Sequence, residues 1–396
     1  MKVLIINSVC GIRSTGKIVM DLYNTIESYG DECCIAYGRD IPPKNIKTIR
    51  IGSNFDNYTH LISSRFLDNH GLGSKKVTKE FIKAIEEYNP DVIHLHNLHG
   101  YYLNIEILFR YLKKINKKVI WTLHDCWAFT GHCASFDYVG CEKWKYGCDN
   151  CCQTGEYPKS IIKDNSKENY LIKKKIFTLL NNMIIVTPSK WLAELVKQSF
   201  LKKYDVKVIN NGIDLNVFKP VENNLRKKYN LEKKFVILGV ASIFNKRKGI
   251  DYFIKLSKIL DNNFKIILIG VPKKIIKSLP NNIICIERID NVDELKEFYT
   301  MADVFFNPTM EEVFGMTNIE SLACGTPVIT FNTGGSPECI LNEKCGFIVK
   351  KGDINEVYKN ILRLKNTEKM ADKIINSASN FDKEEKYKEY IKLYKA

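Results

Sequence analysis

The sequence predicts an α/β protein of two domains, each built on a parallel sheet. The chain has 396 residues, which is enough for two domains with full hydrophobic cores. Short apolar segments typical of buried strands alternate with segments typical of helices in both halves of the chain. Residues 302–331 contain one complete strand–loop–helix–strand unit, and such a unit joins parallel strands.

Composition and charge exclude several other classes. The chain is 45% hydrophobic and 27% charged, which is ordinary for a globular protein. It contains no apolar run of about 18 residues, and its start reads as a buried strand, so we expect a cytoplasmic protein without a membrane span. The net charge of +15 fits phosphorylated ligands or an anionic membrane surface. No nucleic-acid-binding motif accompanies this charge, so we expect no nucleic-acid partner.

The most informative stretch follows the apolar strand 302–307. A short helix is expected to begin just after Gly315, with Thr317 and Asn318 as candidate capping residues, and strand 328–331 follows it. The loop before the helix therefore lies at the carboxyl end of a parallel strand, where open α/β sheets bind ligands.

The start of this helix suits an anion such as a pyrophosphate. Backbone N–H groups would come from Phe314, Gly315, Met316 and Thr317, and Gly315 allows a close approach. Glu312 in the loop and Glu320 about one turn into the helix would accept hydrogen bonds from hydroxyl groups on either side of the phosphates. A nucleotide sugar has this layout. On spacing alone, solvated glutamates and a core Phe314 explain the stretch equally well.

A family resemblance favours the functional interpretation. The pattern Glu-x-Phe-Gly from Glu312, a second glutamate at Glu320, and Ala-Cys-Gly-Thr-Pro-Val from Ala323 resembles the signature of the retaining glycosyltransferases of family 4 (group 1). The resemblance implies the GT-B fold, in which two Rossmann-like domains face a central cleft. Residues 1–212 would form the acceptor-side domain and residues 213–379 the nucleotide-sugar-binding domain. The final helix, 380–396, would pack back on the first domain.

The resemblance also implies a reaction. The chain would be a hexosyltransferase that moves a sugar, with retained configuration, from a UDP- or GDP-sugar to a lipid-linked oligosaccharide. The segment His94-Leu95-His96-Asn97 resembles a subgroup active in bacterial capsule, exopolysaccharide and O-antigen synthesis. A sugar-nucleotide epimerase of the same fold and a catalytically silent scaffold protein are the alternatives, although intact Glu312, Glu320 and Lys248 argue against the scaffold. No Asp-x-Asp motif is present, so we expect no cofactor to be required for catalysis.

Two further candidate sites lie in the first domain. Gly11 and Gly16 frame a turn after the first strand, which either brings N–H groups near a phosphate or is only a tight turn. The family has a glycine-rich loop at this place. His124 and Asp125 end strand 119–123 and either face the cleft or only hold the next loop. In the family the matching histidine contacts the donor sugar.

A basic loop opens the second domain. Arg247 and Lys248 follow strand 235–242, where adjacent cations suit a diphosphate, although a solvated basic turn is common in a Lys-rich chain. The family binds pyrophosphate here with one Arg and one Lys. Lys248 matches the lysine, but the usual Arg position holds no Arg, so the resemblance leaves that role to Ser242 or Arg247.

The thirteen cysteines allow two interpretations. Their odd number, without an export signal, argues against a disulfide scaffold. One interpretation is a structural zinc site, because Cys148-x-x-Cys151 has the spacing of metal ligands and two further thiolates could complete it. The other is a group of buried free thiols. The candidate ligands are Cys133, Cys141, Cys148 and Cys151.

A basic amphipathic helix is expected from Lys159 to Leu180. It is either a solvated surface helix or a contact that places the enzyme peripherally on the inner face of the plasma membrane, near a lipid-linked acceptor. Its lysines are Lys159, Lys163, Lys167, Lys173, Lys174 and Lys175.

Overall fold

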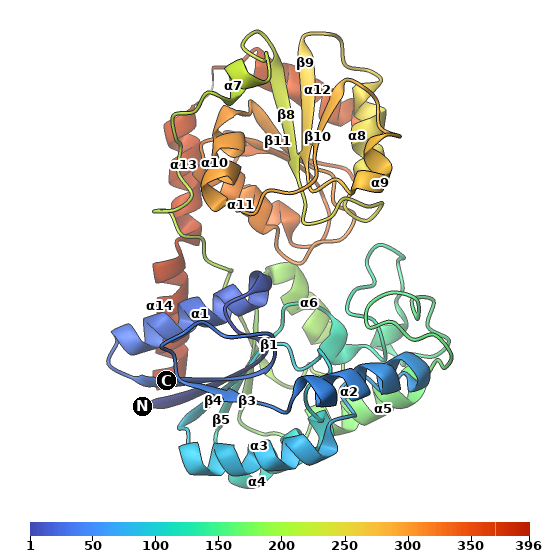
Figure 1. Ribbon diagram of the computed structural model, residues 1–396, viewed down its shortest axis with the longest axis vertical. Coiled ribbons are helices and arrows are strands. Elements are labelled where there is room, and N and C mark those ends of the chain that lie inside the picture. Colours follow the sequence, from blue (N-terminus) through green and yellow to red (C-terminus); the bar gives the residue numbers. More distant parts are fainter. Residues whose placement is uncertain (369) are drawn as a thin grey trace. The chain divides into compact units, whose positions relative to one another are not determined.

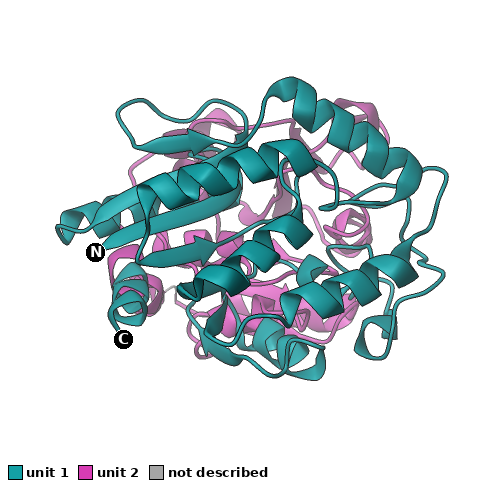
Figure 2. Ribbon diagram, turned by 90° about the horizontal axis from the view of Figure 1, so that it is seen from below, with its two compact units in different colours: residues 1–210, 387–396 teal, residues 211–386 magenta. Residues whose placement is uncertain are grey.

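The chain divides into two compact units, shown in different colours in Figure 2. The computed structural model describes residues 1–368 and 370–396. Unit 1 comprises Met1–Asn210 and Tyr387–Ala396, and unit 2 comprises Asn211–Lys386. The expected boundary between 212 and 213 therefore falls two residues after the observed one, and the returning segment begins at 387 instead of 380. No helix among the described residues is long and apolar enough to cross a membrane.

Unit 1 is built on a parallel sheet of seven strands, which Figure 1 shows with its helices. The strands are β1 (Lys2–Val9), β2 (Glu32–Arg39), β3 (Thr48–Arg50), β4 (Val92–Leu95), β5 (Lys118–Thr122), β6 (Met183–Thr187) and β7 (Asp205–Val208). Their order in the sheet is β3-β2-β1-β4-β5-β6-β7. The order reverses between β1 and β4, and such a switch point is where open α/β sheets bind ligands.

Helices cover both faces of this sheet, which explains its continuous apolar strands. Val3, Leu4, Ile5 and Ile6 of β1 are all fully buried, as expected where a parallel sheet has no solvent face. The helices of unit 1 are α1 (Arg13–Ser28), α2 (Asn54–Leu67), α3 (Lys75–Tyr88), α4 (Ile105–Ile115), α5 (Ser166–Phe177), α6 (Lys190–Gln198) and most of α14 (Lys383–Lys395).

The final helix packs on unit 1 through its tyrosines, as the resemblance implied. Tyr390 and Tyr394 are buried, and the Tyr394 hydroxyl lies 2.7 Å from Nδ1 of His94. Nε2 of His94 lies 2.8 Å from Oγ1 of Thr122. His94 is therefore a hydrogen-bonded core residue that ties α14 to β4 and β5.

Unit 2 is built on a second parallel sheet, of six strands. They are β8 (Phe235–Val240), β9 (Phe264–Ile269), β10 (Ile283–Ile286), β11 (Val304–Asn307), β12 (Val328–Phe331) and β13 (Gly346–Val349), in the order β10-β9-β8-β11-β12-β13. The switch point lies between β8 and β11. The α-helices described in unit 2 are α7 (Leu225–Lys228), α8 (Ile250–Ser257), α9 (Lys273–Ile276), α10 (Val292–Met301), α11 (Met316–Ala323), α12 (Ile354–Lys365) and α13 (Ala371–Ala378).

Alternate residues of the unit 2 strands enter two separate core clusters. Val236 and Leu238 of β8 belong to one cluster, whereas Ile237 belongs to the other. Phe305 and Phe306 of β11 divide in the same way. Because side chains alternate between the faces of a strand, the two clusters lie on opposite faces of the sheet. The predicted α/β class with parallel sheets is confirmed in both units.

Two sequence-based expectations about helices were wrong or incomplete. The basic helix expected over 159–180 is helical only as α5, because residues 159–165 form turns and loops. Helix α2 (Asn54–Leu67) was not predicted from the sequence. Ser53 forms a capping box with Asp56 at the start of α2, a pattern that the sequence displays.

Candidate functional site

Three loops meet at the carboxyl edge of the unit 2 sheet. They follow β8, β11 and β12, and two glycines allow their close approach. A Cβ atom on Gly249 would lie 2.1 Å from the Pro308 carbonyl oxygen, and one on Gly334 would lie 1.8 Å from that of Glu312. Both glycines have positive φ values, 75° and 55°. Only glycine fits at such positions, so the backbone itself brings the basic loop and the Glu312 loop together.

The two expected cations of this edge are paired with carboxylates of the neighbouring loop. Lys248 Nζ lies 2.8 Å from Oε2 of Glu312, and Arg247 Nη2 lies 2.9 Å from Oε1 of Glu311. The side chains of Lys248 and Glu312 are 33% and 23% exposed, so a ligand can reach this pair. Glu311, which the sequence analysis did not single out, is nearly buried. Ser242 lies in the exposed loop that follows β8.

The start of α11 presents backbone N–H groups at this edge. Gly315 is the N-cap residue, with φ of 90°, and no side chain caps the helix. The prediction that Thr317 or Asn318 caps it was therefore wrong. The first N–H groups of a helix have no intrahelical partner, so those of Met316 and Thr317 suit an anion.

Asn318 instead points inward and fixes the position of α11. Its Oδ1 accepts from Asn307 Nδ2 at 2.8 Å, and its Nδ2 donates to Oγ of Ser336 at 2.9 Å. Oγ of Ser336 also lies 2.7 Å from Oγ1 of Thr330. This buried network joins β11, α11, β12 and the turn after it. Sequence reasoning missed it, because the partners of Asn318 lie on other elements of the fold.

The Phe314 side chain is part of the hydrophobic core, which was one of the two interpretations of this stretch of sequence. It is 2% exposed, and its ring lies edge-on to Phe381 at 5.8 Å. Only its backbone remains for a ligand.

Glu320 is oriented by a buried tyrosine. The Tyr299 hydroxyl donates a hydrogen bond of 2.8 Å to Oε2 of Glu320. Burial raises the pKa of Tyr299 well above its usual value, and the charge of Glu320 adds to this effect. Tyr299 therefore remains a protonated donor and holds the carboxylate one turn into α11. Its role could not be seen from the sequence, since it belongs to α10.

The glycine turn of unit 1 is closed by its own hydrogen bond. The N–H of Gly11 donates to the Gly16 carbonyl at 3.0 Å, and Gly16 is buried within α1. Gly11 has φ of 76° and packs against Pro43. The turn follows β1 and lies at the β1–β4 switch point of the sheet.

His124 is a neutral histidine stacked on a second one. Its Nε2 lies 2.9 Å from Nδ1 of His96, with the rings 14° from parallel. Burial lowers the pKa of His124 to about 4, against an opposing effect of Asp125. Burial likewise lowers the pKa of His96. A neutral imidazole exchanges hydrogen bonds with hydroxyl groups without adding charge.

Asp125 holds the following loop. Its Oδ1 accepts from the backbone N–H of Trp127 at 2.9 Å, and its Oδ2 lies 2.8 Å from Nε2 of His99. Of the His124–Asp125 pair, Asp125 therefore has the loop-positioning role that one interpretation gave to both residues.

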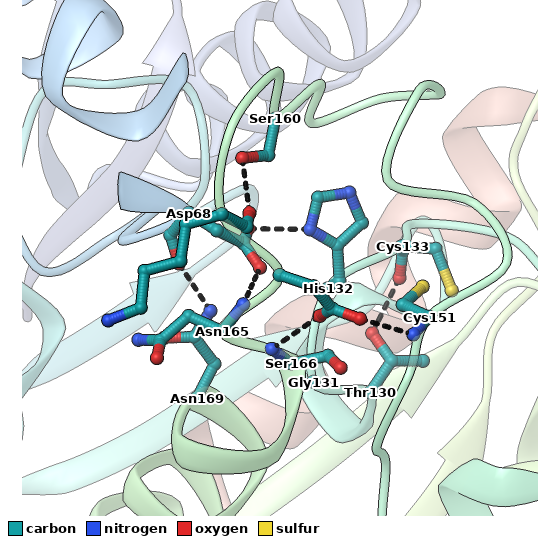
Figure 3. A network of polar contacts seen from close by, with 12 residues as sticks. Asp68, Thr130, Gly131, His132, Cys133, Cys151, Ser160, Asn165, Ser166 and Asn169 are labelled. Atoms are coloured by element: carbon teal, nitrogen blue, oxygen red, sulfur yellow. Dashed lines mark hydrogen bonds and ion pairs between the residues drawn. The ribbon is translucent and has the colours of Figure 1, made fainter. Parts of the chain in front are cut away.

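The cysteine-rich segment is held by a polar network around Asp68, shown in Figure 3. Asp68, just after α2, accepts from His132 Nδ1 at 2.6 Å and from the backbone N–H of Asn165 at 2.8 Å. Both Asp68 and His132 are buried. Hydrogen bonds thus stabilise this segment in the described structure.

The four candidate zinc ligands influence one another electrostatically: Cys148 interacts with Cys141 and Cys151, and Cys133 interacts with Cys148 and Cys151. Cys133 and Cys151 share a hydrogen bond, which raises the pKa of Cys133 and lowers that of Cys151 to about 6. Cys148 Sγ instead accepts from the N–H of Gly131 at 3.1 Å. In the part of the chain that the structure describes, no three His, Cys, Asp or Glu side chains are placed to hold a metal ion. The structural zinc site therefore stays a prediction, which elemental analysis of the purified protein tests.

Comparison with known families identifies the chain. Residues 35–217 match the profile described as glycosyltransferase family 4, and residues 221–381 match that of glycosyl transferases group 1. The chain is a glycosyltransferase, with a family 4 region followed by a group 1 region. The signature around Glu312 and Glu320 thus lies within the second matched region.

Similar curated proteins include several from bacterial polysaccharide loci. This glycosyltransferase is 37% identical over 133 residues to the putative colanic acid biosynthesis glycosyl transferase WcaC of Escherichia coli (strain K12), covering 32% of each chain. It is 30% identical over 224 residues to the capsular polysaccharide biosynthesis glycosyltransferase CapM of Staphylococcus aureus, covering 52% of this chain and 57% of CapM. The matches therefore span less than two thirds of these two relatives.

Solved structures share the whole fold. Sucrose-phosphate synthase from Thermosynechococcus elongatus superposes with a TM-score of 0.72 at 18% identity, covering 100% of this chain and 98% of that one. Anabaena Alr3699/HepE in complex with UDP superposes with a TM-score of 0.68 at 16% identity, covering 99% of both chains. At such identities the likeness shows the fold alone. It confirms the predicted GT-B class of two Rossmann-like units.

Proposed function

We propose that this glycosyltransferase transfers a hexose, with retained configuration, from a nucleotide-sugar donor to a lipid-linked oligosaccharide during bacterial surface-polysaccharide synthesis. The similarity to WcaC and CapM, which are named for colanic acid and capsular polysaccharide biosynthesis, supports this class of pathway. Solved neighbours in complex with UDP and UDP-glucose support a UDP-sugar donor, with a GDP-sugar as the alternative. Peripheral attachment to an anionic membrane would bring the enzyme to such an acceptor.

One observation carries the donor part of this proposal. The uncapped start of α11, two cations and two carboxylates come from separate loops yet meet at one switch point of the unit 2 sheet. In the proposal, the N–H groups from Phe314 to Thr317 bind the diphosphate together with Lys248 and Arg247. Glu320, oriented by Tyr299, accepts from the ribose hydroxyls.

The Lys248–Glu312 pair suggests how binding prepares the reaction. A diphosphate near Lys248 would compete with Glu312 for the ammonium group, since charge-assisted bonds to phosphate are strong. The released Glu312 carboxylate could then accept from hydroxyls of the donor sugar. Neutral His124 is proposed to bind a sugar hydroxyl from unit 1. Fixed cations and N–H donors stabilise the charge that develops on the leaving diphosphate.

A donor panel tests the proposal. The full-length protein is incubated with UDP-, GDP- and dTDP-sugars and lipid-linked acceptors, and products are analysed by mass spectrometry and NMR. Transfer with retained anomeric configuration is expected. Isomerisation of the donor without transfer would indicate an epimerase, and no reaction with any donor would indicate a silent scaffold protein.

A matched pair of variants links activity to the site. Lys248→Ala should abolish most transfer, whereas Lys246→Ala in the same loop should retain it, because Lys246 is exposed and lies outside the proposed contacts. Equal losses in both variants would contradict the assignment of Lys248.

A further inference from the structure

Helix α2 has its apolar face turned toward solvent. Phe55, Tyr58, Ile62 and Phe66 follow one another at intervals of three or four residues, so they form one stripe along the helix. Their exposed fractions are 73%, 60%, 39% and 46%, and that of the adjacent Leu67 is 52%. A surface helix normally buries such a stripe.

The buried face of α2 is polar and hydrogen-bonded. Asn57, His60 and Ser64 are its buried residues. Nδ2 of Asn57 donates to the Gly38 carbonyl at 2.7 Å, and Nδ1 of His60 lies 2.9 Å from Oγ of Ser74. Hydrogen bonds therefore attach the polar face of α2 to the rest of unit 1. Because these contacts fix the orientation of the helix, its apolar stripe faces outward.

The apolar surface continues into a neighbouring loop. The N–H of Ile161 donates to the Arg65 carbonyl at 2.7 Å, which places this loop against the end of α2. Ile161 and Ile162 are 63% and 73% exposed. We name the combined surface the α2 patch. It consists of Phe55, Tyr58, Ile62, Phe66, Leu67, Ile161 and Ile162.

Cations flank the α2 patch. Lys159 and Lys163 are exposed on either side of Ile161 and Ile162. Helix α5 lies beside the end of α2 (Figure 1), where Asn169 Nδ2 donates to the Asp68 carbonyl. The exposed lysines of α5 are Lys167, Lys174 and Lys175.

Lys173 does not belong to this basic rim, although the sequence analysis included it among the membrane-facing lysines. It is 2% exposed, and its Nζ donates to the carbonyls of Trp127 at 2.9 Å and Thr130 at 3.1 Å. Burial lowers the pKa of Lys173 to about 7. Any membrane contact of this region must therefore use the other lysines.

We propose that the α2 patch binds the surface of an anionic lipid bilayer, with its aromatic and aliphatic side chains inserted at the headgroup boundary and the flanking lysines on lipid phosphates. Apolar side chains rimmed by cations are the chemistry of interfacial membrane binding. The exposed lysines of the rim outnumber its exposed carboxylates, Asp164 and Glu168, and the chain carries a net charge of +15, which favours a lipid surface over a basic partner or a second copy. The functional value of this contact rests on the proposed function, because membrane binding would bring the enzyme to a lipid-linked acceptor. Binding to the bilayer can be measured without any transfer reaction.

Vesicle co-sedimentation of the full-length protein tests the proposal. The probes are vesicles of phosphatidylcholine alone and of phosphatidylcholine with phosphatidylglycerol. The wild type should bind only the anionic vesicles, and binding should weaken as salt rises. Phe55→Ser/Phe66→Ser should weaken partitioning by about tenfold or more, because two large side chains lose their burial in lipid. Lys159→Gln/Lys163→Gln should weaken it by about tenfold and reduce its salt dependence.

Controls separate this surface from general stickiness and from catalysis. Ile259→Ser/Leu341→Ser removes two apolar side chains of unit 2 that are 42% and 48% exposed, and it should bind vesicles like the wild type. Melting temperature and nucleotide affinity should be unchanged in every variant. If the phenylalanine variant fails to fold, Ile161→Ser/Ile162→Ser replaces it, since both side chains lie on an exposed loop.

Three results would overturn the proposal. They are no binding of the wild type to anionic vesicles, an equal loss of binding in the unit 2 control, and a dimer in solution that the patch substitutions convert to a monomer. The last result would make the patch a self-association surface. Failure of the donor panel, in contrast, would leave vesicle binding intact and would refute only the proposed function.

Discussion

Replacing Glu320 by alanine tests the proposed ribose contact, but the structure shows that it also disturbs Tyr299. The Tyr299 hydroxyl is buried and donates to Oε2 of Glu320 at 2.8 Å. Glu320→Ala therefore removes a candidate ligand group and leaves a buried donor without this acceptor. The two effects need separate measurements.

The expected magnitudes follow from these contacts. An unsatisfied buried hydroxyl costs about 1–3 kcal/mol, which lowers the melting temperature by about 2–4 °C per kcal/mol for a unit of this size. Each charge-assisted bond to a ribose hydroxyl contributes about 1.5–3 kcal/mol. Loss of one or two such bonds should weaken nucleotide binding by at least about tenfold.

A second substitution separates stability from binding. Tyr299→Phe added to Glu320→Ala removes the orphaned hydroxyl, so the double variant should regain most of the lost stability. It should not regain affinity, because the carboxylate is still missing. Melting temperature is measured by calorimetry, and affinity by titration with the nucleoside diphosphate of the donor that the panel identifies.

The outcome of this cycle can refute the reasoning. If affinity returns together with stability in the double variant, Glu320 acts only through the fold and does not bind the ribose. Unchanged affinity in Glu320→Ala would remove this residue from the site altogether. Tyr299→Phe alone serves as the control for the orienting bond, and it should change affinity only a few-fold.

Three further predictions concern other parts of the chain. Lys248→Ala should lower kcat more than it weakens donor binding, because charge on the leaving diphosphate grows in the transition state; a raised KM with unchanged kcat would make Lys248 a binding residue only. If the four candidate cysteines bind zinc, elemental analysis of protein purified without chelators should find about one equivalent, and a chelator should lower the melting temperature; absence of metal would leave free thiols. Burial lowers the pKa of His94 to about 3, so its contribution to stability is present above its ordinary pKa of 6.5 and is lost as the pH falls toward 3. Denaturant unfolding at pH 7 and 4.5 should show this loss, at up to about 1.4 kcal/mol per pH unit, and it should be smaller in His94→Gln; equal losses would contradict the assignment.

The sequence by itself determined the fold class and much of the candidate donor site. Continuous apolar runs marked the strands, since a parallel sheet covered on both faces has no polar alternation. The predicted bounds of β12 match the observed ones, and the start of α11 after Gly315 is also observed. These features depend on residues that are close together in the sequence, so local sequence patterns predict them.

The partners within the site were decided only by the tertiary structure. Tyr299 on α10 orients Glu320, and Glu311 pairs with Arg247 across two loops. The cap predicted for Asn318 failed because a buried network offered its side chain better partners than the helix N-terminus. Such pairings join segments far apart in the chain, and no spacing rule reveals them.

The same limit applies to the question of which side chains of a helix are buried. A pattern of apolar and polar residues shows that a helix has two faces, but the core contacts decide which face is buried. In α2 the polar face is buried, because Asn57 and His60 find their partners in Gly38 and Ser74. Lys173 looks like a surface cation in the sequence, yet the carbonyls of Trp127 and Thr130 hold it in the interior. Hydrogen-bond partners supplied by the folded chain outweighed the local preference in both cases.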